Sequence, residues 1–141
     1  VQLCDSWAGC LSERDYRARA RVRHALRRFQ HFSETAAREA GLPPAQHQLL
    51  LAVRGHDGDG PPSLTTVAEA LQLKVHSAGE LAGRAAARGL LDRWSDPDDA
   101  RRTLLALTET GEAKLAELSL QHRDELRRFR QEMNDVLREL D

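Results

Sequence analysis

The sequence has few cysteines, few aromatic residues and no long apolar run. Its two cysteines, Cys4 and Cys10, lie near the start with no signal-peptide pattern around them, which favours reduced thiols over a disulfide-stapled secreted fold. The longest strictly apolar run, Leu49 to Val53, is far shorter than the ~20 residues of a membrane-spanning helix. We therefore expect a soluble, cytoplasmic protein.

Groups that would support catalysis or bind a metal are also missing. We find no nucleophile paired with a base and no glycine-rich phosphate loop. His24, His31 and His122 are not spaced as metal ligands, and the Asp57–Gly60 loop lacks the later ligands of a calcium loop. The sequence therefore predicts no enzymatic activity, no metal and no cofactor.

The charge is unevenly distributed along the 141 residues, although the net charge is only −1. From Arg14 to Arg28 seven arginines stand against Asp15 alone, a local charge of +6, whereas residues 109–141 hold nine acids and six bases, a charge of −3. The arginines are spread around a helix instead of forming one stripe, so we expect them to pair with the acidic last helix. A chain of this length is one domain, at about 150 residues per domain.

The spacing of apolar residues predicts helices at both ends of the chain. A long helix is expected over 13–40, before Gly41, and a second helix begins at Pro43-Pro44 and ends at Gly55. The last helix follows Thr108 as its cap. Its apolar stripe is longer than one small core can cover, which predicts burial against a second copy of the chain. The stripe comprises Leu115, Leu118, His122, Leu126, Phe129, Met133, Val136 and Leu140.

Two short helices and a hairpin are expected between these ends. Ser63 or Thr65 can cap a helix that ends at Leu71, and after a tight turn another helix runs from about Val75 to Arg88. The apolar segments 90–94 and 103–107, separated by a polar link, predict a β-hairpin. The fold class is mainly α with a small β-hairpin wing: a winged helix-turn-helix with long terminal helices.

The run LAGRAAARGLLDRWSDPDDARRTLLALTETGEAKL resembles the MarR family of bacterial transcription regulators. The shared pattern is Arg88-Gly89-Leu90, then Asp99-x-Arg101, then Leu107-Thr108, and GLPPAQHQLLLAV is similar too. The resemblance implies a 1–13 tail and a single domain over 14–141. Within that domain it implies a winged helix-turn-helix at about 44–108 and dimerisation helices at about 14–40 and 109–141.

The resemblance also implies a homodimeric DNA-binding regulator, acting as a repressor, whose recognition helices enter successive major grooves of a pseudo-palindromic operator. A small aromatic or anionic effector bound between the terminal helices and the winged domain would tune its affinity. The matching DNA-contact positions are at the helix N-terminus, along the helix and in the wing, where the acid steadies the arginine. They are Lys74, His76, Ser77, Glu80, Arg84, Asp99, Arg101 and Arg102.

Other interpretations of these positions stay open. Arg84 could form a surface salt bridge instead, and Asp99 with Arg101 could be an ordinary ion pair at a hairpin tip. Glu80 stands where a basic or polar residue is common in the family, and Gly79 and Gly83 each cost the helix about 1 kcal/mol relative to Ala. These features keep open an alternative function: a winged-helix dimer that has lost DNA binding and acts through protein–protein contacts.

Overall fold

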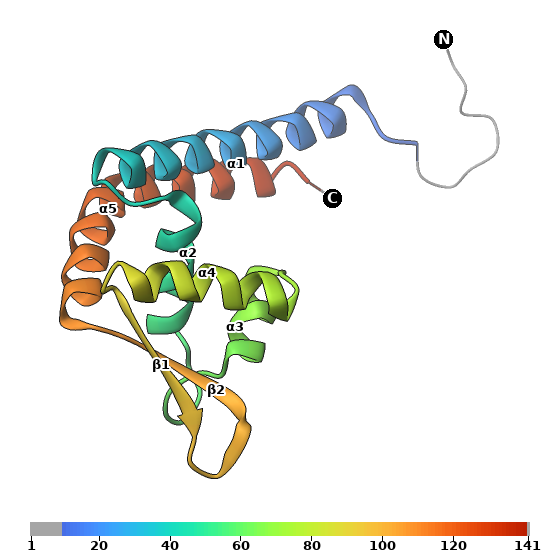
Figure 1. Cartoon of the computed structure of the whole chain (residues 1–141). Helices are drawn as coiled ribbons and strands as arrows, with labels where there is room; N and C mark the ends of the chain where they lie inside the picture. The colour runs from blue at the N-terminus through green and yellow to red at the C-terminus, as the bar shows by residue number, and fades with distance from the viewer. Residues whose placement is uncertain (1–9, 141) are drawn as a thin grey trace. The chain divides into compact units, whose positions relative to one another are not determined.

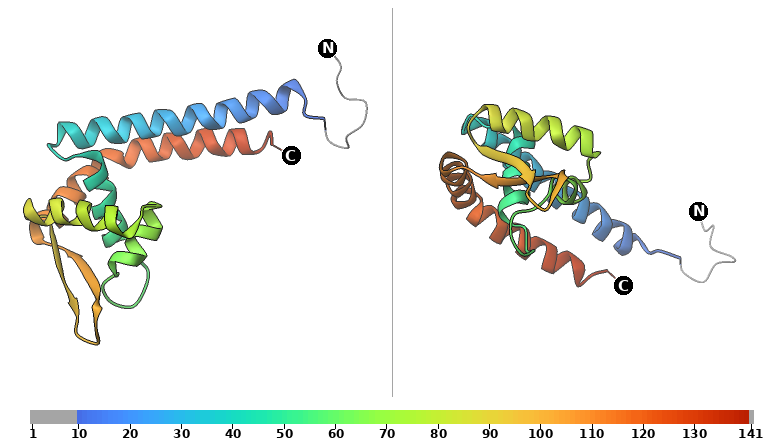
Figure 2. Two further views of the ribbon diagram at one scale, coloured as in Figure 1. Left: turned by 45° about the vertical axis from the view of Figure 1, so that its right-hand side comes forward. Right: turned by 60° about the horizontal axis from the view of Figure 1, so that its bottom comes forward.

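The computed structural model of the chain describes residues 10–140, which form helices and one antiparallel hairpin (Figures 1 and 2). In chain order the elements are α1 (Glu13–Glu39), α2 (Pro44–Arg54), α3 (Leu64–Leu71), α4 (Val75–Ala87), β1 (Leu91–Asp96), β2 (Asp99–Leu107) and α5 (Glu109–Leu137). This order confirms the expected mainly α fold with a small hairpin. Among the described residues, no helix combines the length and apolarity needed to cross a membrane.

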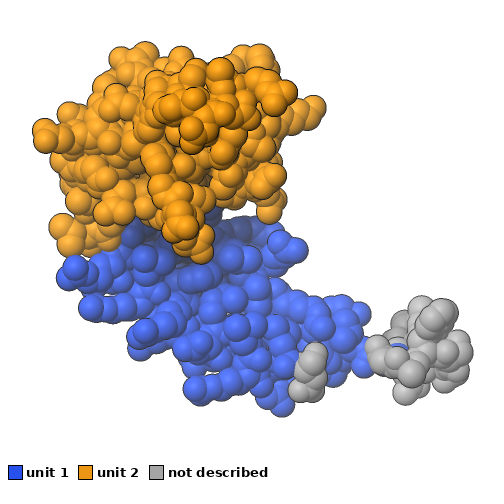
Figure 3. Space-filling view, turned by 90° about the horizontal axis from the view of Figure 1, so that it is seen from below, with its two compact units in different colours: residues 1–33, 122–141 blue, residues 34–121 orange. Residues whose placement is uncertain are grey.

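The described residues group into two compact units (Figure 3). One, which we call the helical unit, contains the residues up to Ser33 and those from His122 onward. The other, the winged unit, contains residues 34–121. Each unit therefore has its own internal packing, and the two are described separately.

In the helical unit, α1 and α5 run antiparallel. Arg21 Nη1 lies 2.8 Å from Glu139 Oε2, and Arg28 pairs with Glu132, about two turns earlier on α5. Glu132 lies on α5 and Glu139 just after it, so the predicted pairing of the arginine-rich segment with the acidic C-terminal segment is confirmed at Arg21 and Arg28.

Aromatic side chains pack between α1 and α5 farther from the chain ends than the two ion pairs. The rings of Phe29 and Phe129 have centroids 5.2 Å apart. The buried His122 places Nε2 3.0 Å from Ser33 Oγ and lies edge-on to Phe32. His122 is therefore a buried side chain of the helix pair with a hydrogen-bonding partner, as a packed histidine requires.

The first turn of α1 is capped by its own side chains. The Asp15 carboxylate accepts hydrogen bonds from the Ser12 backbone N–H (2.7 Å) and hydroxyl (2.8 Å), while Ser12 Oγ accepts from the Asp15 N–H. These bonds lower the pKa of Asp15, because they favour its ionised form. The cap is therefore complete above the ordinary carboxyl pKa and is lost as the pH falls through the lowered one.

The cysteine prediction needs a correction. Cys4 lies outside the described residues, and Cys10 is disulfide-bonded, so the expectation of reduced thiols is wrong at Cys10. Cys10 is exposed and precedes the first helix, where a thiol is accessible to oxidation.

The apolar stripe of α5 is covered within one chain more fully than the sequence suggested. Four of its eight members are at least nine-tenths buried: Leu115, Leu118, His122 and Val136. The expectation overlooked that His122 and Val136 lie in the part of α5 that pairs with α1, whereas Leu115 and Leu118 are buried within the winged unit. Leu126 remains 49% exposed, and Leu137 near the end of the helix is 52% exposed. The exposed apolar surface of α5 is thus smaller than the whole stripe and includes Leu126 and Leu137.

The winged unit is built on a helix-turn-helix with well-defined ends. Ser63 begins α3, because its Oγ accepts a hydrogen bond from the Thr66 N–H at 3.2 Å. Gln72 ends it in the left-handed conformation at φ 55°, which turns the chain into α4. The inner faces of α2, α3 and α4 share one apolar core, whose fully buried members include Leu49, Leu50, Val67, Ala78 and Ala85.

The hairpin of β1 and β2, which we call the wing, is longer than predicted. Its register pairs Leu91 with Leu107 and Ser95 with Thr103, and a bulge follows at Ser95/Asp96. The expected polar link forms the outer part of both strands because Asp96 closes the turn: it accepts from the Asp98 N–H at 2.9 Å and pairs with Arg102 at 3.3 Å. In Figure 1 and the left view of Figure 2 the tip of the wing extends beyond α3.

The base of the wing is closed by hydrogen bonds between its two ends. Thr108 donates its hydroxyl to the Gly89 carbonyl at 2.6 Å and its N–H to the Leu90 carbonyl at 3.2 Å. The same hydroxyl accepts from the Gly111 N–H at 3.0 Å and so caps α5. The Arg-Gly-Leu and Leu-Thr motifs are therefore two halves of one junction, which we call the wing-base junction.

Gly111 tests how closely this junction is packed. A Cβ at Gly111 would collide with the Leu90 backbone carbonyl, so Gly111→Ala should lower the free energy of unfolding by about 1–3 kcal/mol. Gly79→Ala is the matched control, because its Cβ would meet only Leu64 Cδ2 at 3.5 Å and the helix should gain up to about 1 kcal/mol. Urea unfolding at one protein concentration measures both. Equal stability of Gly111→Ala and the wild type would show that the junction can relax.

Candidate nucleic-acid interface

The N-terminus of α4 is open to a ligand. Lys74 is the N-cap residue and makes no side-chain cap hydrogen bond. His76 and Ser77, in the first turn, are exposed. Unpaired N–H groups at a helix start carry a partial positive charge, and together with Lys74 they suit a phosphate group.

Farther along α4, charged side chains form an exposed row. His76, Glu80 and Arg84 follow one another at intervals of four residues and therefore share a face. His76 Nε2 lies 3.2 Å from Glu80 Oε1, with their side chains 86% and 59% exposed. Arg84 forms no ion pair with any residue in the described part of the chain. The surface salt bridge considered for Arg84 is thus not formed, and its guanidinium is free for a ligand.

The two glycines of α4 make room for neighbouring side chains. Arg93 of β1 lies across Gly83, where an added Cβ would be 3.4 Å from both terminal guanidinium nitrogens. Gly79 similarly faces Leu64 of α3. Both glycines weaken the helix intrinsically; Gly83 leaves the Arg93 guanidinium close against the helix, whereas a Cβ at Gly79 would make only an ordinary contact with Leu64.

Arg93 is a further candidate site residue, which the sequence patterns did not single out. It is exposed and pairs in register with Leu105, and it shares a strand face with the buried Leu91. The alternation of side chains along a strand places it on the side that packs on α4. The alternation along the strand, together with the glycine at position 83, could have indicated from the sequence that Arg93 lies against α4.

The wing carries the remaining predicted residues. Asp99 Oδ1 accepts from the Arg101 backbone N–H at 3.1 Å and lies 3.4 Å from Arg101 Nε. The Arg101 side chain is 93% exposed. The Asp99 carboxylate therefore holds the Arg101 backbone and Nε in place, while the end of the guanidinium projects into solvent. Arg102 instead pairs with Asp96, whose side chain is only 12% exposed. Asp99 and Arg101 thus form the predicted pair, and Arg102 also braces the turn.

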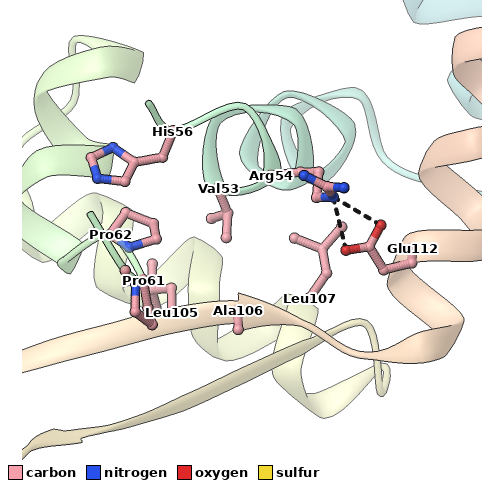
Figure 4. Close-up of a pocket in the computed structure, with 10 residues that line it drawn as sticks. Val53, Arg54, His56, Pro61, Pro62, Leu105, Ala106, Leu107 and Glu112 are labelled. Atoms are coloured by element: carbon pink, nitrogen blue, oxygen red, sulfur yellow. Dashed lines mark hydrogen bonds and ion pairs between the residues drawn. The ribbon is translucent and has the colours of Figure 1, made fainter. Parts of the chain in front are cut away.

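A cavity of about 310 Å³ lies on another part of the winged unit (Figure 4). Its apolar wall includes Val53, Pro62 and Leu105. At one end Arg54 Nε pairs with both carboxylate oxygens of Glu112, at 3.0 and 3.1 Å, as the dashed lines show. The cavity is at the lower end of the size range of small-molecule sites, about 300–1,000 Å³. Across residues 10–140, no group of three or more His, Cys, Asp or Glu side chains is placed to hold a metal ion.

Comparison with known proteins assigns this architecture. Residues 40–102 match the model of the MarR family, over the helix-turn-helix and most of the wing. The fold of these residues is similar to a MarR-family winged helix. The resemblance noted in the sequence is confirmed, and the family is one of transcription regulators. No curated protein sequence matches the chain.

Several solved structures have a similar fold. AbsC, a MarR family transcriptional regulator from Streptomyces coelicolor, is 20% identical with a TM-score of 0.72, and the match covers 86% of this chain and 82% of AbsC. BpsR from Bordetella bronchiseptica is 26% identical with a TM-score of 0.63, over 80% and 83% of the two chains. A mutant of MepR from S. aureus, bound to an oligodeoxyribonucleotide, is 21% identical with a TM-score of 0.63, over 75% of each chain.

The wing of this MarR-type fold gives a direct test of the interface. Arg101→Ala should weaken DNA binding and reduce the salt dependence by about one phosphate contact if Arg101 meets the backbone, or relax A·T preference if it enters the minor groove. Asp99→Ala should produce a smaller loss, because the arginine keeps its charge. The melting temperatures should change little, since exposed ion pairs contribute only about 0–1 kcal/mol.

Salt titrations of operator binding, with melting curves, measure these effects. Arg127→Ala is the matched control, since Arg127 forms a similar 3.4 Å pair with Asp124 on α5. Unchanged affinity in Arg101→Ala would remove the wing from the interface, whereas loss of folding would identify a structural ion pair.

Proposed function

We propose that the protein is a sequence-specific, double-stranded DNA-binding transcription regulator that acts as a homodimeric repressor and is not an enzyme. The observation that carries this proposal is the outward face of α4. An uncapped N-terminus, an unpaired Arg84 and the exposed row that contains it lie on the same winged unit as the projecting Arg101. A helix that enters a major groove and a wing that reaches a neighbouring groove use these features.

The proposed roles follow from the chemistry of each side chain. Lys74, His76 and Ser77 contact phosphates at the start of the helix, and Glu80 and Arg84 meet base edges. On the wing, Arg101 contacts DNA and Asp99 orients the Arg101 side chain. Arg102 braces the tip of the wing close to the DNA backbone. The 14–141 domain would act in the cytoplasm, with its winged part at 44–108 on DNA and the helices at 14–40 and 109–141 in the dimer.

We further propose that a small aromatic or anionic effector releases the DNA. The support comes from a relative: DNA binding by BpsR is regulated by 6-hydroxynicotinic acid. MepR supports the DNA-bound state, since a mutant of it is bound to an oligodeoxyribonucleotide. Calorimetric titration of the protein with 6-hydroxynicotinic acid, with and without DNA, tests the effector class.

A winged-helix dimer that acts through protein contacts is the second candidate. The negative charge of Glu80 on the exposed face of α4 favours it, because phosphates repel a carboxylate. A gel shift with the DNA upstream of the chain's own gene separates the two functions. Absence of sequence-specific binding there and to selected random duplexes would favour protein contacts.

The spacing of the half-sites tests the proposed DNA docking. A two-fold dimer should require half-site centres ~10–10.5 bp apart, so that both helices meet major grooves on one face of the duplex. Inserting ~5 bp turns one half-site away by about half a turn and should reduce affinity toward the non-specific level, ~10³-fold or more weaker. Fluorescence anisotropy at fixed salt measures the loss. Inserting ~10 bp keeps the rotational phase, and unchanged binding with the ~5 bp insertion would contradict this docking.

The exposed strip of α5 tests the dimer. Leu126→Asp should place an unpaired charge in a subunit interface and shift the protein toward monomer, because burying an unpaired carboxylate is unfavourable. Phe129→Asp should do the same but also disturb the contact with Phe29 inside one chain. Light scattering at micromolar concentration reports the mass. Gln131→Asp is the control on another exposed face, and a monomeric wild type would rule out the dimer.

A further inference from the structure

The exposed row of α4 carries a charge pattern that is unfavourable for DNA in general. A helix that only had to bind phosphates would gain from positive charge along this row, yet its central residue is the carboxylate Glu80. The buried face of α4 holds Ala78, Leu81, Ala82 and Ala85, so Glu80 has no part in the core. The carboxylate is therefore placed where it can act on a ligand that offers hydrogen-bond donors.

We propose that Glu80 selects cytosine at one position of each half-site by accepting a hydrogen bond from the cytosine N4 amino group. This inference rests on the proposed DNA-binding function and adds the identity of a base to it.

The choice of cytosine follows from the groups that bases present in the major groove. An ionised carboxylate accepts hydrogen bonds and donates none. Guanine presents two acceptors, N7 and O6, and thymine presents the acceptor O4 beside a methyl group, so both repel it. Adenine offers its N6 amino group next to the acceptor N7. Cytosine presents only the N4 amino group and is the best match.

The neighbours of Glu80 leave one carboxylate oxygen for this contact. His76 Nε2 lies 3.2 Å from Oε1, and Oε2 has no partner among residues 10–140. His76 therefore orients the carboxylate from one turn before it, and acts as a positioning residue. Arg84 lies one turn beyond, about 6 Å along the helix axis, so it meets a different base pair. Its guanidinium suits O6 and N7 of guanine.

Selection from random-sequence duplexes by the full chain, followed by competition titrations, tests the proposal. Wild type should enrich cytosine at one position of each half-site, with about fivefold weaker binding to the other bases there. Glu80→Gln should replace that preference with adenine, because an amide matches N6 and N7 of adenine with both a donor and an acceptor. Preferences at the other positions should persist, including the guanine expected for Arg84.

Two variants separate base reading from charge and orientation. Glu117→Gln on α5 removes one exposed negative charge elsewhere, so it should raise affinity for all duplexes slightly and leave the cytosine preference intact. His76→Ala should keep cytosine as the preferred base but reduce the affinity difference between cytosine and the other bases, because Glu80 loses the group that orients it. It should also lower the affinity for all duplexes, because the proposed phosphate contact of His76 is lost.

The outcomes distinguish this inference from the proposed function. Sequence-specific binding with the same base preferences in wild type and Glu80→Gln would overturn the role of Glu80 and leave the DNA-binding function standing. Failure of the folded wild type to enrich any sequence would overturn both. Melting curves confirm that each variant is folded.

Discussion

The winged unit depends on the hydrogen bonds that Thr108 makes at the wing-base junction. One hydroxyl donates to the Gly89 carbonyl and accepts from the Gly111 N–H, and so joins the end of α4 to the start of α5. Arg88 adds a bond from its guanidinium to the Gly41 carbonyl at 2.6 Å, which ties the same region to the turn before α2. The helix proposed to face DNA, the wing and the last helix thus share one anchoring point, and the Arg88-Gly89-Leu90 and Leu107-Thr108 parts of the motif shared with the MarR family build it.

The electrostatics of the two units differ. In the helical unit, charges of opposite sign are paired between α1 and α5, as at Arg21 and Glu139. On the winged unit Arg84 and Arg101 keep exposed guanidinium groups. The winged unit as a whole holds nine Lys and Arg against 13 Asp and Glu, so a surface suited to a polyanion is confined to these exposed side chains of α4 and the wing.

Local patterns in the sequence were sufficient for the elements, because caps and helix-ending glycines act over a few residues. Ser63 and Thr108 begin the helices that they were expected to begin. The outer part of the wing was missed, since its pairing depends on Asp96, a polar residue whose role emerges only when the turn closes. The cover of the α5 stripe was underestimated because part of it comes from α1, at the opposite end of the sequence.

In the candidate site, too, contacts between residues close in sequence could be predicted, and contacts between different elements could not. The Asp99–Arg101 pair lies within one short stretch of chain and was predictable, whereas the position of Arg93 depends on a glycine in another element.

The contact between position 83 and Arg93 limits which substitutions the α4 surface can accept. An alanine Cβ there would only touch the Arg93 guanidinium, whereas a larger side chain would have to displace it, so larger substitutions at 83 are expected to be epistatic with changes at 93. A variant that acquires a new base preference through a larger residue at position 83 of α4 would then also need a changed side chain at position 93 of the wing.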